Sequence, residues 1–131
     1  MSTTLSLLIV SALAQEPPPA ADLPSAEEQA LIIVYGERAK EWRGSVKSVE
    51  GVPTCKTKRS TGDAQIDAIR CGAMITCMAP ISAEYSRILA SDVKRKEKKE
   101  RAYALLQTTL PCMDDFYDRE FASLARARAT Q

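Results

Sequence analysis

The 131-residue sequence contains no histidine. Histidine is the commonest general base near neutral pH and the commonest metal ligand, so its absence excludes a catalytic Ser–His or Cys–His pair of the usual kind. The sequence also has no glycine-rich phosphate-binding loop. Its net charge is only +1, so no overall field draws the protein to nucleic acid or to a membrane surface. We therefore expect no enzymatic activity, no cofactor, no metal and no nucleic-acid partner.

The sequence has no apolar run of membrane-spanning length near its start, but it does have a short one. Residues 5–13 carry no charge, and Ala12-Leu13-Ala14 has the small-x-small pattern that signal peptidase accepts. A membrane-spanning helix needs about 20 apolar residues, so no stable membrane span is expected here. We predict a signal peptide over residues 1–14, cleaved before Gln15, and a periplasmic or secreted protein.

Residues 15–28 are predicted to form a proline-rich spacer. Three consecutive prolines, Pro17 to Pro19, favour polyproline II and block a helix. The remaining residues, 29–131, suit a single small domain with a modest core.

The first half of this domain is predicted to contain β-structure. Leu31 to Tyr35 is a run of mainly apolar, β-branched residues closed by Gly36, which is typical of a strand. Residues 42–49 and 52–59 are predicted to form a β-hairpin around Glu50-Gly51, because glycine allows the positive φ of a tight turn.

A central helix is predicted from Ala64 to Pro80, with Asp63 as its N-cap. Its apolar residues occupy two nearly opposite faces, which is typical of a helix covered from two sides. One face carries Ile66, Ile69, Ala73 and Cys77, and the other carries Cys71, Met74, Ile75 and Met78.

Two or three helices are predicted to follow Pro80. Ser82 is the expected cap of the first, with Tyr85, Ile88, Leu89 and Val93 turned inward. A basic run interrupts this apolar stripe, which resumes at Ala102, Tyr103, Leu105 and Leu106. One long helix that projects past the core and two helices that meet at a polar joint both fit this pattern.

The last helix is predicted to begin at Pro111, where a missing N–H costs little. Asp114 and Asp115 suit its positive N-terminus, and Arg126 and Arg128 suit its negative C-terminus. Its predicted buried stripe consists of Met113, Phe116, Tyr117, Phe121 and Leu124. The predicted fold class is α+β: a small hairpin packed on a central helix, followed by two or three C-terminal helices.

Four cysteines in an exported chain predict two disulfides. Zinc is disfavoured, because the cysteines are 16, 6 and 35 residues apart and no histidine is present. Cys71 and Cys77 point to different faces of one helix, about 9 Å apart along its axis, so they cannot bond to each other. Two pairings remain open: Cys55–Cys71 with Cys77–Cys112, and Cys55–Cys77 with Cys71–Cys112.

The middle of the chain, about residues 42–80, resembles the cysteine-bearing C-terminal domain of TonB-type energy transducers. The motif is a glycine turn, a strand cysteine, a Ser-Thr-Gly loop, and a helix with an Ile-Asp pair and a cysteine. Its residues here are Gly51, Cys55, Ser60-Thr61-Gly62, Ile66-Asp67 and Cys71. The resemblance implies a hairpin–helix shape and favours Cys55–Cys71, which leaves Cys77–Cys112. After Pro80 that family continues with strands, so we do not carry over its energy-transducing function.

One strongly basic segment is the candidate partner contact. It contains six cations and two anions between residues 94 and 101, and runs of mixed sign are also typical of a solvated helix face. The cations are Lys94, Arg95, Lys96, Lys98, Lys99 and Arg101.

We consider three functional hypotheses. The first is an exported, non-enzymatic protein that binds an envelope protein or an anionic envelope component. The second is a TonB-related envelope factor that uses its hairpin edge for strand addition. The third is a small hydrolase built on the carboxylates of Asp114, Asp115 and Asp118, although helix-dipole complementarity also explains the first two.

Overall fold

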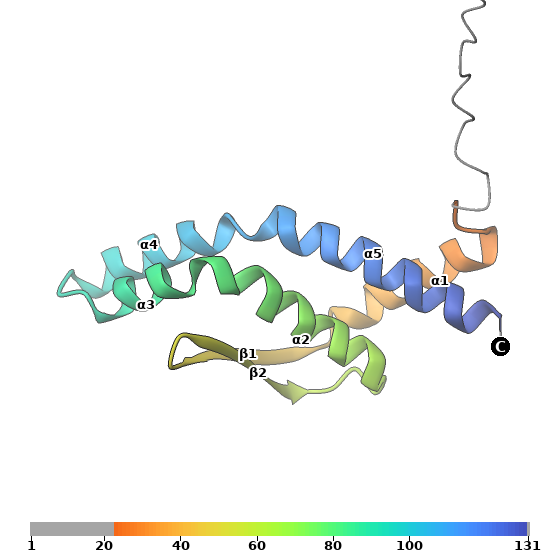
Figure 1. Ribbon diagram of the computed structural model, residues 1–131, viewed down its shortest axis with the longest axis horizontal. Coiled ribbons are helices and arrows are strands. Elements are labelled where there is room, and N and C mark those ends of the chain that lie inside the picture. Colours follow the sequence, from red (N-terminus) through yellow and green to blue (C-terminus); the bar gives the residue numbers. More distant parts are fainter. Residues whose placement is uncertain (1–22, 131) are drawn as a thin grey trace, which may run out of the picture.

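The computed structural model describes residues 23–130, so the predicted signal peptide and most of the predicted spacer lie outside the described residues. The predicted α+β class is confirmed: one β-hairpin is combined with several helices in an elongated molecule (Figure 1). The elements are α1 (Ala26–Ala39), β1 (Arg43–Val49), β2 (Val52–Arg59), α2 (Ala64–Met78), the 3₁₀ turn η2 (Ala79–Ile81), α3 (Ser82–Ala90), α4 (Arg95–Gln107) and α5 (Leu110–Ala129).

The prediction of a strand at residues 31–35 is wrong, because this run lies inside α1. Ser25 caps the helix: its Oγ accepts a hydrogen bond from the Glu28 N–H at 3.1 Å. Tyr35 and Ala39, one turn apart, are buried, and α1 packs against α5. Tertiary packing of one helical face therefore overrides the β-propensity of the run. The helix begins at Ala26, inside the segment that we expected to be spacer.

The predicted hairpin is confirmed. Its strands pair antiparallel, with Val46 opposite Cys55, and its turn has positive φ angles at Glu50 (52°) and Gly51 (78°). Gly44 is required for a different reason. A Cβ at this position would clash with the Trp42 ring and with the Lys56 carbonyl oxygen. Trp42 is itself buried, and its indole Nε1 donates to Thr57 Oγ1 at 3.0 Å.

The central helix α2 is covered from two sides, as predicted. Cys71 bonds to Cys55 on β2, and Cys77 bonds to Cys112 in the first turn of α5. Of the two pairings that helix geometry left open, this is the one present. The disulfides thus attach α2 to the hairpin on one face and to α5 on another.

Three helices follow Pro80, and the first two, α3 and α4, are separated by a joint at residues 91–94. Ser82 does not cap α3, contrary to our prediction. The backbone is already helical through η2, so α3 begins with no side-chain cap. The buried Ser82 hydroxyl instead donates to Ser48 Oγ on β1 at 3.1 Å, which ties the start of α3 to the hairpin.

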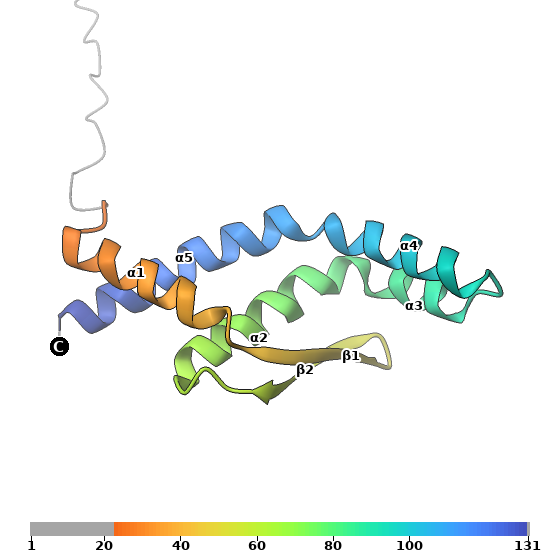
Figure 2. The ribbon, with the colours of Figure 1, turned by 180° about the vertical axis from the view of Figure 1, so that it is seen from behind.

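Helix α5 carries much of the core. Arg126 and Arg128 lie in its last turn, as predicted, but the helix begins at Leu110, one residue before the predicted start at Pro111. Asp114 and Asp115 fall after the first turn, because the helix begins at Leu110, so dipole complementarity does not explain them as we expected. The main core joins α1, α2 and α5, which lie side by side in both views (Figure 2). Its buried residues are Tyr35, Ala39, Ile66, Phe121 and Ala125.

Within the described part of the chain, one segment is long and apolar enough to cross a membrane by length and composition. This segment, Ala64–Ala90, comprises α2, η2 and α3. Its α2 portion buries Ile66, Ala73 and Cys77 within the protein, and 22% of the apolar window as a whole is buried.

Candidate functional site

A groove lies between α3 and α4. These two helices form the end of the molecule opposite to α1 (Figure 1). The volume of the groove is about 640 Å³, which lies within the usual range of ligand sites. The apolar lining consists of Tyr85, Leu89, Ala102, Tyr103 and Leu106. Four charged residues of α4 complete it: Arg95, Lys98, Lys99 and Glu100. The groove therefore combines an apolar floor with a mainly cationic rim.

The structure divides the predicted partner-contact residues into two sets. Arg95, Lys98 and Lys99 line the groove, because spacings of three and four residues place them on one face of α4. Lys94 and Lys96 are exposed and do not line it. Arg101 pairs with Glu97 at 2.6 Å, with both side chains about half exposed, so that ion pair contributes little to stability.

Two residues that we predicted to be turned inward are exposed instead. Leu89 is 48% exposed and Tyr103 is 65% exposed, and both line the groove. Periodicity placed them correctly on the apolar faces of α3 and α4, but the packing of the described elements leaves these faces partly open to solvent. The sequence pattern that could have indicated the groove is the apolar stripe that precedes and follows the basic run.

A second groove of about 360 Å³ continues the first toward the hairpin. It shares Tyr85 and Leu89 with the first groove, and Lys47, Ser48 and Pro53 contribute the hairpin side. Another cation, Lys47, thus stands beside the apolar surface. We call α3, α4 and the adjoining hairpin the groove end of the molecule, and α1, the first turns of α2 and the C-terminal half of α5 the core end.

Charge is distributed unequally between these two ends. Residues 82–107 carry seven cations and four anions, and the hairpin, residues 43–59, carries five cations and one anion. The other described residues carry six cations and ten anions. The small net charge of the whole chain thus conceals a basic groove end and an acidic remainder.

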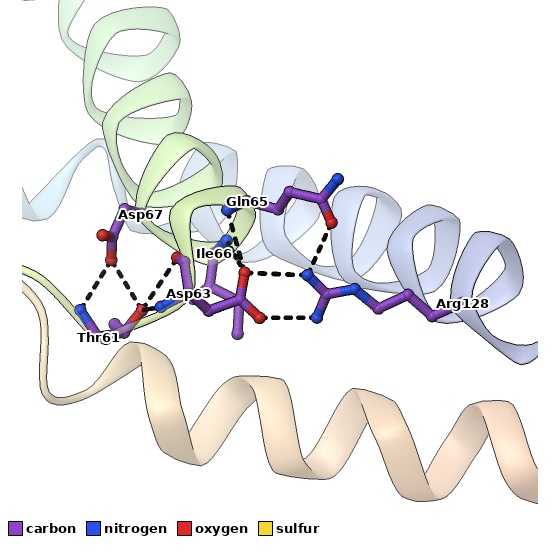
Figure 3. A network of polar contacts seen from close by, with 6 residues as sticks. All are labelled: Thr61, Asp63, Gln65, Ile66, Asp67 and Arg128. Atoms are coloured by element: carbon purple, nitrogen blue, oxygen red, sulfur yellow. Dashed lines mark hydrogen bonds and ion pairs between the residues drawn. The ribbon is translucent and has the colours of Figure 1, made fainter. Parts of the chain in front are cut away.

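A polar network fixes the core end (Figure 3). Arg128 near the end of α5 donates two hydrogen bonds to the Asp63 carboxylate, at 2.7 and 2.9 Å, and a third to Gln65 Oε1 at 2.7 Å. Asp63 is also the N-cap of α2 and accepts from the backbone N–H of Gln65 at 3.0 Å. One carboxylate therefore caps α2 and joins it to α5.

The same network shifts several pKa values. The hydrogen bonds from Arg128 lower the pKa of Asp63 to about 2, and Asp63 in turn raises the pKa of Arg128. Burial acts to raise the pKa of Asp67, but hydrogen bonds from Ser60 and Thr61 outweigh it and lower that pKa. All these charges are satisfied within the protein, so the network holds the fold together and offers no unpaired group to a ligand.

A second cluster joins the hairpin to α5 through Arg70 of α2. The Arg70 guanidinium lies 5.0 Å from the Trp42 ring and 5.3 Å from the Tyr117 ring, within cation–π range, and it donates to the Tyr117 hydroxyl at 2.5 Å. Burial raises the pKa of Tyr117, and Arg70 opposes that shift. Arg70 thus fills the space between Trp42, next to the hairpin, and Tyr117 on α5.

The remaining candidate residues are on the surface. Asp114, Asp115 and Asp118 are exposed on α5, and Asp115 pairs with Arg119 at 3.2 Å. Trp42 and Tyr35 are buried. Among residues 23–130, no group of three Cys, Asp or Glu side chains is arranged to hold a metal ion.

Comparisons with known proteins return no match. No protein-family model matches the chain, and no curated protein and no solved structure is significantly similar to it. The class that the fold defines is therefore a small α+β protein with two disulfides. Any function must be argued from its surfaces.

Proposed function

We propose that this is an exported, non-enzymatic binding protein that recognises another component of the cell envelope through the groove between α3 and α4. The observation that carries the proposal is the exposed apolar floor of the groove, where Leu89 is 48% and Tyr103 65% exposed. Exposed apolar patches bordered by charge are typical of interaction sites.

The cationic rim defines the kind of partner. Arg95, Lys98 and Lys99 line the groove, and Lys47 lines its continuation. The long Lys and Arg side chains can lay their methylene groups on the apolar floor and keep their charges in water. Such a surface favours a partner that has an apolar stripe and acidic flanks.

The two disulfides support export, because disulfides persist in oxidising compartments such as the periplasm or the extracellular space. The proposal includes removal of residues 1–14. Intact mass measurement of the protein from a periplasmic or secreted fraction should give a chain that starts at Gln15. A chain that keeps Met1 and occurs only in the cytoplasm would contradict export.

Capture from an envelope fraction tests the role of the groove. The full chain is immobilised as wild type, as Lys98→Glu/Lys99→Glu, and as the control Lys56→Glu/Lys58→Glu, which reverses two charges on the exposed face of the hairpin outside both grooves. We expect wild type and control to capture the same component and the groove variant to lose it. Equal capture by all three would contradict a role for the groove.

Strand addition is a second candidate, because the sheet consists of β1 and β2 alone in the described residues. Each strand therefore has one edge that is not paired with another strand. Strand addition can be tested without changing the sequence, by isotope-edited NMR of the strand amides in the presence of the captured component. Blocking a strand N–H by substitution at Thr57 would also disturb the hydrogen bond from Trp42 to Thr57. Shifts confined to these amides would favour strand addition, whereas shifts at Leu89 and Tyr103 would favour the groove.

A further inference from the structure

The groove on one end of the molecule is matched by an exposed apolar stripe on the other end. The stripe lies on the face of α1 that points away from α5, and Ile33 is 68% and Val34 50% exposed there. Ala26, Ala30 and Glu37 continue the same face at spacings of three and four residues. We call this surface the outer face of α1.

The outer face of α1 has the opposite charge to the groove. Exposed Glu27, Glu37 and Glu41 flank the apolar centre. Two exposed cations, Arg38 and Lys40, lie near these three carboxylates, so the acidic excess is one charge. Lys40 pairs with Glu37 at 2.9 Å, but both side chains are about 70% exposed, so this pair is weak and can exchange partners. A helix face with an apolar stripe and an acidic excess is the kind of partner that the groove favours.

The two surfaces also agree in length. The lining residues of α4 run from Arg95 to Leu106, and the outer face of α1 runs from Ala26 to Glu37. Each interval is eleven residues, or about 16 Å at helical rise. One helix can therefore lie along the other over the whole groove, which is the helix-in-groove mode of recognition.

We propose that the groove between α3 and α4 binds the outer face of α1 from a second copy of this chain, so that molecules associate head to tail. The proposal rests on the proposed function, since it concerns the same groove and takes the envelope component bound there to be a second copy of this chain. The two surfaces lie at opposite ends of one molecule (Figure 1), so they cannot meet within it. Each contact leaves one groove and one α1 face available, and such contacts form open chains or closed rings.

The shape of the groove favours this occupant over a lipid surface. A flat bilayer covers protruding side chains, whereas an α-helix fills a concave channel between two antiparallel helices. With α1 in place, Leu89 and Tyr103 become part of a three-helix layer. The interface involves one helix and one groove, so the association is weak and reversible.

Sedimentation velocity over a range of concentrations tests the proposal on the purified full chain. Wild type should change from monomer to larger species as its concentration rises, and added salt should reverse this because the complementary charges are screened. Ile33→Glu and Tyr103→Glu each disable one surface at an exposed position. Each should weaken self-association about tenfold or more, and the control Val52→Glu, which adds the same charge at an exposed valine outside both surfaces, should not.

Mixing the two variants gives the decisive result. The Ile33→Glu protein retains its groove, and the Tyr103→Glu protein retains its α1 face, so an equimolar mixture should form dimers that cannot grow. Circular dichroism spectra like that of the wild type establish that both variants are folded. A mixture that stays monomeric, or wild type that stays monomeric at every concentration, would overturn the proposal.

Two further arms distinguish other occupants of the groove. Binding to phosphatidylglycerol vesicles by monomeric wild type but not by Tyr103→Glu would assign the groove to anionic lipid and overturn self-association. If wild type is monomeric while Lys98→Glu/Lys99→Glu still loses its envelope component, the proposed function stands and only this inference fails. If the groove variants affect neither self-association nor capture, both proposals fail.

Discussion

The core end and the groove end of this molecule are built from similar helices but differ in what covers them. In the core end, α1, α2 and α5 bury Tyr35, Ile66 and Phe121 against one another. In the groove end, α3 and α4 pack mainly on each other, and each has a single buried residue, Ser82 and Ala102. A helix pair with only one neighbour leaves an apolar face uncovered. The comparison places most of the packing in one end and supports the proposal that binding occurs at the other.

The disulfides are expected to give the largest effect, because they hold the frame to which both ends are attached. In the chain-entropy model each is worth about 3 to 4 kcal/mol, and typical domains have only about 5 to 15 kcal/mol in total. Replacing all four cysteines by alanine should therefore leave the chain largely unfolded at 37 °C. Thermal unfolding followed by circular dichroism measures this, and a cooperative transition near the wild-type temperature would contradict it.

A matched pair of aromatic truncations compares the two ends directly. Phe121→Ala removes a buried ring that stacks on Tyr117 with centroids 5.6 Å apart, and should lower the free energy of unfolding by about 3 to 5 kcal/mol. Tyr103→Ala removes an exposed ring from the groove and should lower it by less than about 0.5 kcal/mol. Urea titration measures both, and similar losses would remove the distinction between the ends.

The ion pair between Asp63 and Arg128 predicts a pH dependence for the core end. The pKa of Asp63 is about 2 in the folded protein and about 4 in an unfolded chain. The stabilisation is therefore complete above about pH 4 and is lost as the pH falls toward 2. Asp63→Asn keeps a capping side chain but loses the ion pair, and should cost about 2 kcal/mol at pH 7.

The control for this prediction is Asp115→Asn, which removes an exposed partner of Arg119 and should change stability by less than about 0.5 kcal/mol. Below pH 2, wild type and Asp63→Asn should become nearly equal in stability. If the difference in the free energy of unfolding between wild type and Asp63→Asn is the same at pH 7 and pH 2, the ion pair does not cause that difference.

The smallest effect on stability is expected from the basic run. Replacing Lys94, Lys96, Lys98 and Lys99 by glutamine removes exposed or half-exposed charges, so the melting temperature should shift by only a few degrees. Self-association, in contrast, should weaken and lose its dependence on salt. A large drop in melting temperature would mean that the run is packed and would place part of the stability in the groove end.

Sequence patterns predicted local structure best where short-range chemistry decides it. The Glu50-Gly51 turn, the Asp63 cap and the position of Pro111 depend on neighbouring residues, and the structure has all three. The strand predicted at residues 31–35 failed because burial against α5, a contact between distant parts of the chain, decides that segment.

The candidate site was only half predictable for the same reason. Charge spacing pointed to the basic run, and periodicity identified the apolar faces that carry Leu89 and Tyr103. Nothing in a single sequence says whether another element of the same chain covers such a face. The groove is open because α3 and α4 lie at the end of the molecule opposite to α1. That position depends on the whole fold, so the sequence pattern of the two helices does not reveal it.

The separation of stability from binding is tested most directly by amide hydrogen exchange, since exchange reports the free energy of local opening along the chain. In dilute solution, α4 should exchange markedly faster than the C-terminal half of α5. As the protein concentration rises, α4 and α1 should become protected while the C-terminal half of α5 stays unchanged. If α4 is already as well protected as α5 in dilute solution, the groove end is part of the stable core and the account is contradicted.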